Sequence, residues 1–154
     1  MAVESIAPYR EPVRKSVTVR CTPARAFSVF TEGMSAWWPL PSHSLSAGRA
    51  AGCGIEPRVG GNVYEVRDDG ERTSWGWVVA WEPPSRLVLK WHPGHERSQA
   101  QEVEIRFTPV GGGTRVDLEH RGWEALGAGA ADARDGYNQG WGVFVELFAR
   151  ACAS

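Results

Sequence analysis

The sequence has few cysteines, no long apolar run and almost no net charge, and each absence excludes a class of protein. Cys21, Cys53 and Cys152 form no C-x-x-C pair, so we expect neither a disulfide framework nor a thiolate metal site. No stretch approaches the roughly 20 apolar residues of a membrane span. The net charge of −1 comes from scattered charges of both signs, which argues against nucleic-acid and anionic-membrane surfaces.

Motifs of common enzyme classes are also missing. The chain has no G-x-S-x-G, no P-loop and no dinucleotide fingerprint. His92 and His95 flank a turn and His43 lies in a loop, but no carboxylate or cysteine follows at a ligand spacing. We therefore predict no metal and no cofactor. The N-terminus lacks the apolar core of a signal peptide, which favours a cytoplasmic location.

Tryptophan, in contrast, is abundant. A chain of 154 residues has the length of one domain and can bury roughly 68–70% of its unfolded surface. We predict a single domain over residues 1–154, with a loose N-terminal arm at 1–10. Eight tryptophans in it indicate either a bulky core or a cavity walled by rings. They are Trp37, Trp38, Trp75, Trp77, Trp81, Trp91, Trp123 and Trp141.

Local patterns predict the order of elements. Alternation from Val13 to Cys21 indicates a strand, and Thr22-Pro23 begins a helix that ends near Gly33. A short second helix carries Trp37-Trp38 before Pro39, and residues 40–52 form a loop. Strand candidates separated by Gly and Pro turns then follow at 53–58, 62–68, 72–82, 86–92, 101–109 and 114–121.

The later strands each have one apolar and one charged face. The apolar positions are Leu87, Leu89 and Trp91, then Val103, Ile105 and Phe107, then Val116, Leu118 and His120. In 72–82, strict alternation puts Trp75, Trp77 and Trp81 on one face. Gly76 and Val78 on the other face are apolar too, so the pattern leaves the inward face open.

The last helix, about 131–152, carries a single apolar stripe. Its members are Tyr137, Trp141, Phe144, Val145 and Phe148. Three glycines, Gly136, Gly140 and Gly142, interrupt it at roughly 1 kcal/mol each relative to alanine, which indicates close packing or space left for a ligand. A sheet with one apolar face must be covered. We therefore predict an α+β helix-grip architecture, a curved antiparallel sheet of about seven strands around this helix.

Several segments, in this order and spacing, resemble a known family. They are Ala26-Phe27-x-x-Phe30-Thr31, Trp37-Trp38-Pro39, Glu56-Pro57-Arg58-Val59-Gly60-Gly61, Trp75-Gly76-x-Val78, Trp81-Glu82-Pro83-Pro84-x-Arg86-Leu87, His120-x-Gly122-Trp123 and Gly140-Trp141. The chain resembles the activator of heat-shock-protein-ninety ATPase-like proteins of the START and Bet v 1-like, helix-grip superfamily. The resemblance implies that fold and a ligand cavity, with a substrate and reaction that vary between relatives.

The predicted ligand cavity lies between the sheet and the last helix. Its candidate residues are Phe30, Trp38, Trp75, Trp77, Leu89, Trp91, Ile105, Phe107, Leu118, His120, Tyr137, Gly140, Trp141 and Phe144. His120 either contacts the ligand or serves as a structural histidine. Glu65 either lies inside, paired with an arginine or histidine, or lies at a solvated strand edge with Glu56 and Arg67. The solvated reading is favoured.

We predict that the protein binds a small, largely apolar or aromatic molecule, and we assign no catalytic residue. Two alternatives stay open. One is a cyclase-, aromatase- or hydrolase-type enzyme using the same cavity, with His120 near Glu65, Arg67 or Tyr137. The other is a co-chaperone-like module, which we do not favour because the exposed strand faces carry evenly mixed charge. The pattern predicts no nucleic-acid or membrane partner and leaves monomer and homodimer open.

Overall fold

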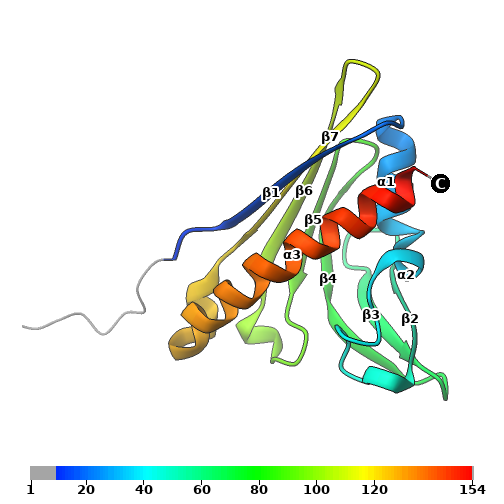
Figure 1. Ribbon diagram of the computed structural model, residues 1–154. Coiled ribbons are helices and arrows are strands. Elements are labelled where there is room, and N and C mark those ends of the chain that lie inside the picture. Colours follow the sequence, from blue (N-terminus) through cyan, green and yellow to red (C-terminus); the bar gives the residue numbers. More distant parts are fainter. Residues whose placement is uncertain (1–9, 154) are drawn as a thin grey trace, which may run out of the picture.

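The computed structural model describes residues 10–153, so the loose arm predicted for 1–10 lies, apart from Arg10, outside the described residues. The elements follow the predicted order (Figure 1). The strands are β1 (Val13–Val19), β2 (Ala50–Ile55), β3 (Asn62–Arg67), β4 (Arg72–Glu82), β5 (Arg86–Trp91), β6 (Gln101–Val110) and β7 (Gly113–Arg121). The helices are α1 (Pro23–Thr31), α2 (Met34–Trp37) and α3 (Ala130–Cys152), with short 3₁₀ turns η1 (Ala47–Arg49), η2 (Arg97–Gln99) and η3 (Trp123–Gly129).

The seven strands form one antiparallel sheet in the order β1-β7-β6-β5-β4-β3-β2. The predicted α+β helix-grip architecture is confirmed: the sheet curls around α3, which crosses it diagonally with α1 and α2 beside its C-terminal half (Figure 1). One predicted strand is misplaced. The segment 53–58 was expected to be extended, but β2 ends at Ile55, because Pro57 has no N–H for a ladder and Glu56 to Gly61 turn back on themselves.

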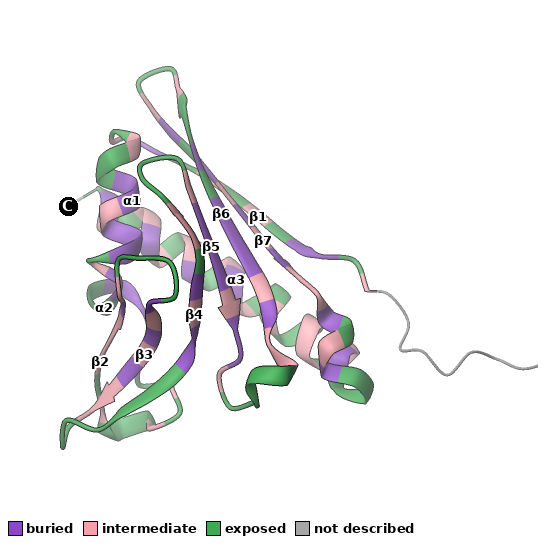
Figure 2. Cartoon of the chain, turned by 180° about the vertical axis from the view of Figure 1, so that it is seen from behind, coloured by how far each residue is buried: buried purple, intermediate pink, exposed green. Residues whose placement is uncertain are grey.

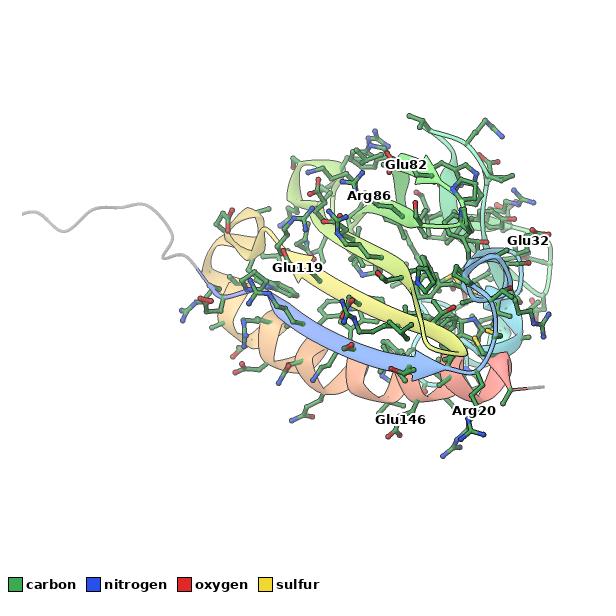
Figure 3. The ribbon with its side chains drawn as sticks, turned by 90° about the horizontal axis from the view of Figure 1, so that it is seen from above. Arg20, Glu32, Glu82, Arg86, Glu119 and Glu146 are labelled. Atoms are coloured by element: carbon green, nitrogen blue, oxygen red, sulfur yellow. The ribbon has the colours of Figure 1, made fainter. Side chains whose placement is uncertain are left out.

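The two faces of the sheet differ as the alternation predicts. The inward residues of β5, β6 and β7 are almost fully buried, whereas the outward face carries ion pairs. Glu104, for example, is held by Arg86 at 2.7 Å and by Arg106 and Arg121 at 2.8 Å. Figure 2 shows buried residues along the strands and exposed ones in the loops, and Figure 3 shows Arg86 and Glu119 directed away from the covered face.

Aromatic side chains fill the end of the core where α1, α2 and α3 meet. Thr22 caps α1 by accepting a hydrogen bond from the Arg25 N–H at 3.1 Å, which fixes the start of the helix. Phe30 then packs edge-on against Phe148 with ring centroids 5.4 Å apart. Each such ring pair contributes about 0.5–1.5 kcal/mol beyond its buried area. These rings belong to the hydrophobic core.

Strand β4 departs from simple alternation at two bulges. At the first bulge, Tyr64 of β3 pairs with Ser74 and Val63 pairs with Gly76, so Trp75 is an extra residue without a partner on β3. At the second, Val78 pairs with Leu89 and Ala80 with Val88 of β5, so Val79 is the extra residue. Each bulge adds a residue, so the face of the following side chains is reversed. Gly76 has a φ of +155° and packs so closely that a Cβ would lie 1.8 Å from the Lys90 carbonyl oxygen. Only glycine fits there.

Candidate functional site

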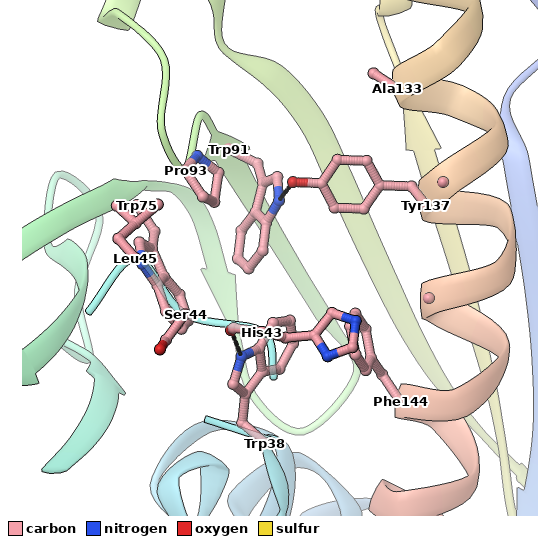
Figure 4. Close-up of a pocket in the computed structure, with 12 residues that line it drawn as sticks. Trp38, His43, Ser44, Leu45, Trp75, Trp91, Pro93, Ala133, Tyr137 and Phe144 are labelled. Carbon is pink, nitrogen blue, oxygen red and sulfur yellow. Dashed lines mark hydrogen bonds between the residues drawn. The ribbon is translucent and has the colours of Figure 1, made fainter. Parts of the chain in front are cut away.

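A cavity of about 380 Å³ lies between α3, the sheet and the loop that follows α2 (Figure 4). Its size falls within the roughly 300–1,000 Å³ that is usual for small-molecule pockets. The lining residues are Trp38, His43, Ser44 and Leu45 from the loop, Trp75, Trp91 and Pro93 from β4, β5 and the following turn, and Ala133, Gly136, Tyr137, Gly140 and Phe144 from α3. None of them is a lysine, arginine, aspartate or glutamate, so the wall carries no fixed charge.

Half of the residues in this wall carry an aromatic ring. The Trp38 ring lies 4.4 Å from Phe144, 5.4 Å from Trp75 and 5.8 Å from Trp91, measured between centroids. Because each ring is locked by its neighbours, the shape of the cavity is set before any ligand arrives. A flat apolar molecule would meet ring faces and edges on several sides.

Each of the three indole N–H groups in the wall already has a partner. Trp38 donates to the His43 carbonyl oxygen at 2.7 Å, Trp75 to Glu65 at 2.9 Å and Trp91 to the Tyr137 hydroxyl oxygen at 3.0 Å. These bonds orient the rings and satisfy the polar edge of each indole. The wall tryptophans therefore offer a ligand apolar surface rather than N–H donors.

Glu65 lies behind this wall, fully buried on the inward face of β3. Its carboxylate accepts hydrogen bonds from the Leu45 N–H at 2.7 Å, the Ser46 N–H at 2.8 Å, the Ser46 hydroxyl and the Trp75 indole. Burial by itself raises the pKa of this carboxyl, but the hydrogen bonds from Ser46, Leu45 and Trp75 lower it more, so the pKa lies below its ordinary value. Glu65 thus stays ionised and ties the loop to the sheet.

The favoured reading of Glu65 as a solvated edge residue is wrong, and so is the pairing expected for a buried one. Main-chain N–H groups, a hydroxyl and an indole replace the arginine or histidine that was expected. Glu56 and Arg67, in contrast, form ion pairs on the surface, with Arg58 and Asp69 respectively. They do not line the cavity.

Twelve of the fourteen predicted cavity residues fall into two groups, and the other two, His120 and Trp77, are described below. Trp38, Trp75, Trp91, Tyr137, Gly140 and Phe144 come together around the cavity. The second group is buried elsewhere in the core: Phe30, Leu89, Ile105, Phe107, Leu118 and Trp141. The alternation of apolar residues shows that a side chain faces inward. Whether that side chain meets a void or another side chain depends on how the sheet packs against the helices.

His120 is placed in the core rather than in the cavity or at its mouth. It is fully buried and stacks on Trp123, with ring centroids 4.0 Å apart. Its Nδ1 accepts from the Trp141 indole N–H at 3.0 Å, which leaves Nε2 as the donor to the Gln101 side-chain oxygen at 3.1 Å. Burial lowers the pKa of His120 to about 3, so the ring is neutral and both nitrogens are engaged. It is a structural histidine.

Trp77 was predicted inside and lies outside. The bulge at Trp75 reverses the alternation, so Trp75 is 1% exposed in the core while Trp77 faces outward beneath the Arg97 guanidinium, 3.9 Å from its ring centroid. The second bulge turns Trp81 inward again, 5.1 Å from Phe27. The three tryptophans therefore do not share one face, because bulges depend on the partner strand and not on the pattern of β4 itself.

Comparison with known proteins identifies the family. A family model described as activator of Hsp90 ATPase homolog 1-like protein matches residues 20–152. The chain belongs to this family. The resemblance inferred from the sequence motifs is thereby confirmed. No curated protein sequence matches the chain at a significant level.

This member of the Hsp90 ATPase activator homolog 1-like family resembles several solved structures. Two of them share more than 25% of its sequence. Txn09, an anthrahydroquino-gamma-pyrone synthase complexed with SUM, is 32% identical, with 93% of this chain and 97% of that chain covered and a TM-score of 0.62. CalC, a self-sacrificing resistance protein from Micromonospora echinospora, is 28% identical, with 94% and 96% covered and a TM-score of 0.67. The Aha1 dimer from Colwellia psychrerythraea, at 16% identity, 93% and 96% coverage and a TM-score of 0.67, shows the fold alone.

Sequence reasoning missed half of the cavity wall in this family member. Ala133 and Gly136 stand on α3 one turn before Tyr137 and Gly140, so helical spacing could have found them. The loop residues His43, Ser44 and Leu45, and Pro93, carry no periodic signal. The loop is held by Glu65, 20 residues away from Leu45, and by the nearby Trp38, which donates to the His43 carbonyl oxygen.

Two further features are absent from residues 10–153. Within this range no group of three or more His, Cys, Asp or Glu side chains lies close enough together to hold a metal ion. No helix there combines the length and apolar character needed to cross a membrane.

Proposed function

We propose that this protein binds a small, flat, largely aromatic molecule in the cavity between α3 and the sheet. The observation that carries the proposal is the uncharged cavity of about 380 Å³ walled by Trp38, Trp75, Trp91 and Phe144. Transfer of apolar ligand surface out of water contributes roughly 25 cal/mol per Å² buried. A charged ligand would lose its hydration without gaining an ion pair.

The relatives support the same class of ligand. Txn09 carries the name of a synthase of an anthrahydroquinone-fused pyrone, which is a planar, oxygen-bearing polycyclic aromatic molecule. This relative is 32% identical over nearly the full length of both chains. We therefore choose oxygenated aromatic compounds as the first class of ligand to test. The similarity to the Aha1 dimer, at 16% identity, carries no argument for a chaperone partner.

A second candidate function is an enzyme of the cyclase or aromatase type, which the similarity to a synthase favours. Of the groups expected for it, only Tyr137 lines the cavity, whereas Glu65, Arg67 and His120 do not. The His120 ring lies 4.7 Å from that of Tyr137, but both of its nitrogens are engaged by Trp141 and Gln101. Any chemistry would instead rely on Tyr137 and on His43, whose side chain stands exposed at the mouth. Binding is therefore the function we place first.

Titration of tryptophan fluorescence with neutral aromatic compounds of one to three rings tests the proposal. Three of the eight tryptophans line the cavity, so a bound aromatic molecule is expected to quench a substantial part of the emission. Native mass spectrometry of the same mixtures should show one molecule retained per chain. Free N-acetyltryptophanamide, titrated in parallel, corrects for absorption by the compounds. The absence of both quenching and retained mass up to the solubility limit would refute the proposal.

A further inference from the structure

The cavity has very few polar groups that a ligand could contact. The indole N–H groups of Trp38, Trp75 and Trp91 are all used within the protein. The Ser44 hydroxyl oxygen has no hydrogen-bond partner among the described residues, but it is sealed from solvent. The His43 ring stands exposed at the mouth, with its Nδ1 2.8 Å from the Ser42 hydroxyl oxygen. The Tyr137 hydroxyl is therefore the group to examine within the cavity.

Tyr137 projects from α3 across the cavity towards Trp91 (Figure 4). A phenol hydroxyl has one hydrogen to donate and two lone pairs. The Trp91 N–H takes one lone pair at 3.0 Å, and no other described residue forms a hydrogen bond with this oxygen. Its hydrogen therefore has no acceptor among the described residues, at a point on the cavity wall.

The Trp91 bond also makes Tyr137 a better donor. A hydroxyl that accepts a hydrogen bond is polarised and donates more strongly, and the low-dielectric surroundings add to this effect. Burial raises the pKa of Tyr137, and the bond from Trp91 lowers it only in part, so the group keeps its proton at neutral pH. Tyr137 is thus a fixed, uncharged donor rather than a base.

We propose that Tyr137 selects aromatic ligands that carry a neutral acceptor oxygen, such as a ring carbonyl, by donating a hydrogen bond to it. This inference rests on the binding function proposed above and narrows its ligand class. The remainder of the molecule lies between Trp38, Trp75 and Phe144, and the acceptor oxygen lies against the Tyr137 hydroxyl, next to Trp91. A carboxylate is disfavoured at this position, because the cavity wall offers no cation.

Two bicyclic probes of nearly equal size test the proposal. Chromone carries a ring carbonyl and naphthalene has no acceptor oxygen. Dissociation constants are measured by fluorescence quenching and by calorimetry for the wild type, Tyr137→Phe and the matched control Tyr64→Phe. Tyr64 lies on β3 beneath Arg72, away from the cavity. We expect Tyr137→Phe to weaken chromone binding about tenfold, the effect of one hydrogen bond, and to leave naphthalene binding unchanged. Tyr64→Phe should change neither.

Each outcome decides a different point. If the wild type binds both probes but Tyr137→Phe weakens them equally or not at all, the role of Tyr137 is wrong and the binding function stands. If His43→Ala and not Tyr137→Phe removes the preference for chromone, recognition lies at the mouth and the proposal is overturned. If neither probe binds the wild type, the binding function fails and this inference with it.

Infrared spectroscopy of the wild type covers the case in which Tyr137→Phe does not fold. The carbonyl stretching band of bound chromone should move to a lower wavenumber than the band of chromone in hexane, since donation from a hydroxyl weakens the C=O bond. A band at the hexane position would show that the bound carbonyl accepts no hydrogen bond, and would refute the proposal without any variant.

Discussion

Glu65 shows how one residue can organise a site that it does not touch directly. Its carboxylate is buried on β3, and its four hydrogen bonds come from the loop residues Leu45 and Ser46 and from Trp75. In residues 10–153 no ion pair includes it. The cost of burying this charge is offset by the several donors that converge on it. One side chain therefore fixes both a wall tryptophan and the loop at the cavity mouth.

Glu65→Gln tests this arrangement at the residue scale. The substituted amide group presents an NH₂ to N–H donors, so at least one buried donor loses its acceptor. We expect the free energy of unfolding to fall by roughly 1–3 kcal/mol, measured by urea denaturation at neutral pH. Glu71→Gln, at an exposed position of the neighbouring turn, is the control and should stay close to the wild type. Equal stability of Glu65→Gln and wild type would show that the carboxylate does not hold the loop.

At the scale of elements, α3 combines a helix that covers the sheet with one wall of a cavity. Its aromatic stripe packs on the sheet, while Gly136 and Gly140 leave space at its N-terminal half. A Cβ at Gly136 would meet nothing within 4 Å, and one at Gly140 would touch only the Phe144 ring at 3.4 Å. Gly142 lies on a different side, where a Cβ would meet the Lys15 Nζ at 4.0 Å. Two of the three helix glycines therefore shape the cavity.

Gly140→Leu should fill the cavity from the helix side. We expect it to abolish quenching by aromatic ligands while making the helix intrinsically more stable, because glycine costs roughly 1 kcal/mol relative to better helix formers. Gly142→Leu gives the same gain in helix propensity without entering the cavity and should bind ligand like the wild type. Fluorescence titration and thermal unfolding of both variants provide the comparison. Unchanged ligand affinity in Gly140→Leu would place the binding site elsewhere.

At the scale of the whole molecule, polar groups inside the core link folding to pH. His120 joins β7 to α3 through Trp141 and to β6 through Gln101, so it bridges the sheet and the helix that covers it. Burial lowers the pKa of this histidine to about 3 in the folded protein. In the unfolded chain the pKa of a histidine is about 6.5. Between these values the unfolded chain binds a proton that the folded protein does not.

Stability should consequently decrease as the pH falls below about 6.5, and continue to decrease until the folded protein also takes up the proton near pH 3. The contribution of His120 approaches about 1.4 kcal/mol per pH unit. Urea unfolding of His120→Gln between pH 7 and pH 5 should show a flatter dependence than the wild type. His95→Gln, at an exposed position after β5, should retain the wild-type slope. Identical slopes for His120→Gln and wild type would contradict a neutral, buried His120.

The sequence alone determined the order of elements, the inward faces of β5 to β7, the apolar stripe of α3 and the family. Each of these rests on a period of two or 3.6 residues, or on motifs contiguous in the chain, and such signals are local. Strand β4 marks the limit, because its first bulge turns Trp77 outward and its second returns Trp81 to the inward face, and both bulges follow from pairing with β3 and β5.

Tertiary structure decided which inward residues meet empty space. Tyr137 meets Trp91 across 46 positions of sequence, Glu65 meets Leu45 across 20, and His120 meets Trp141 across 21. A hydrogen bond between such residues forms only after the elements that carry them have packed together, and no local pattern encodes it. The cavity is the volume that remains when those contacts are complete, so it is a property of the packed molecule and not of any segment.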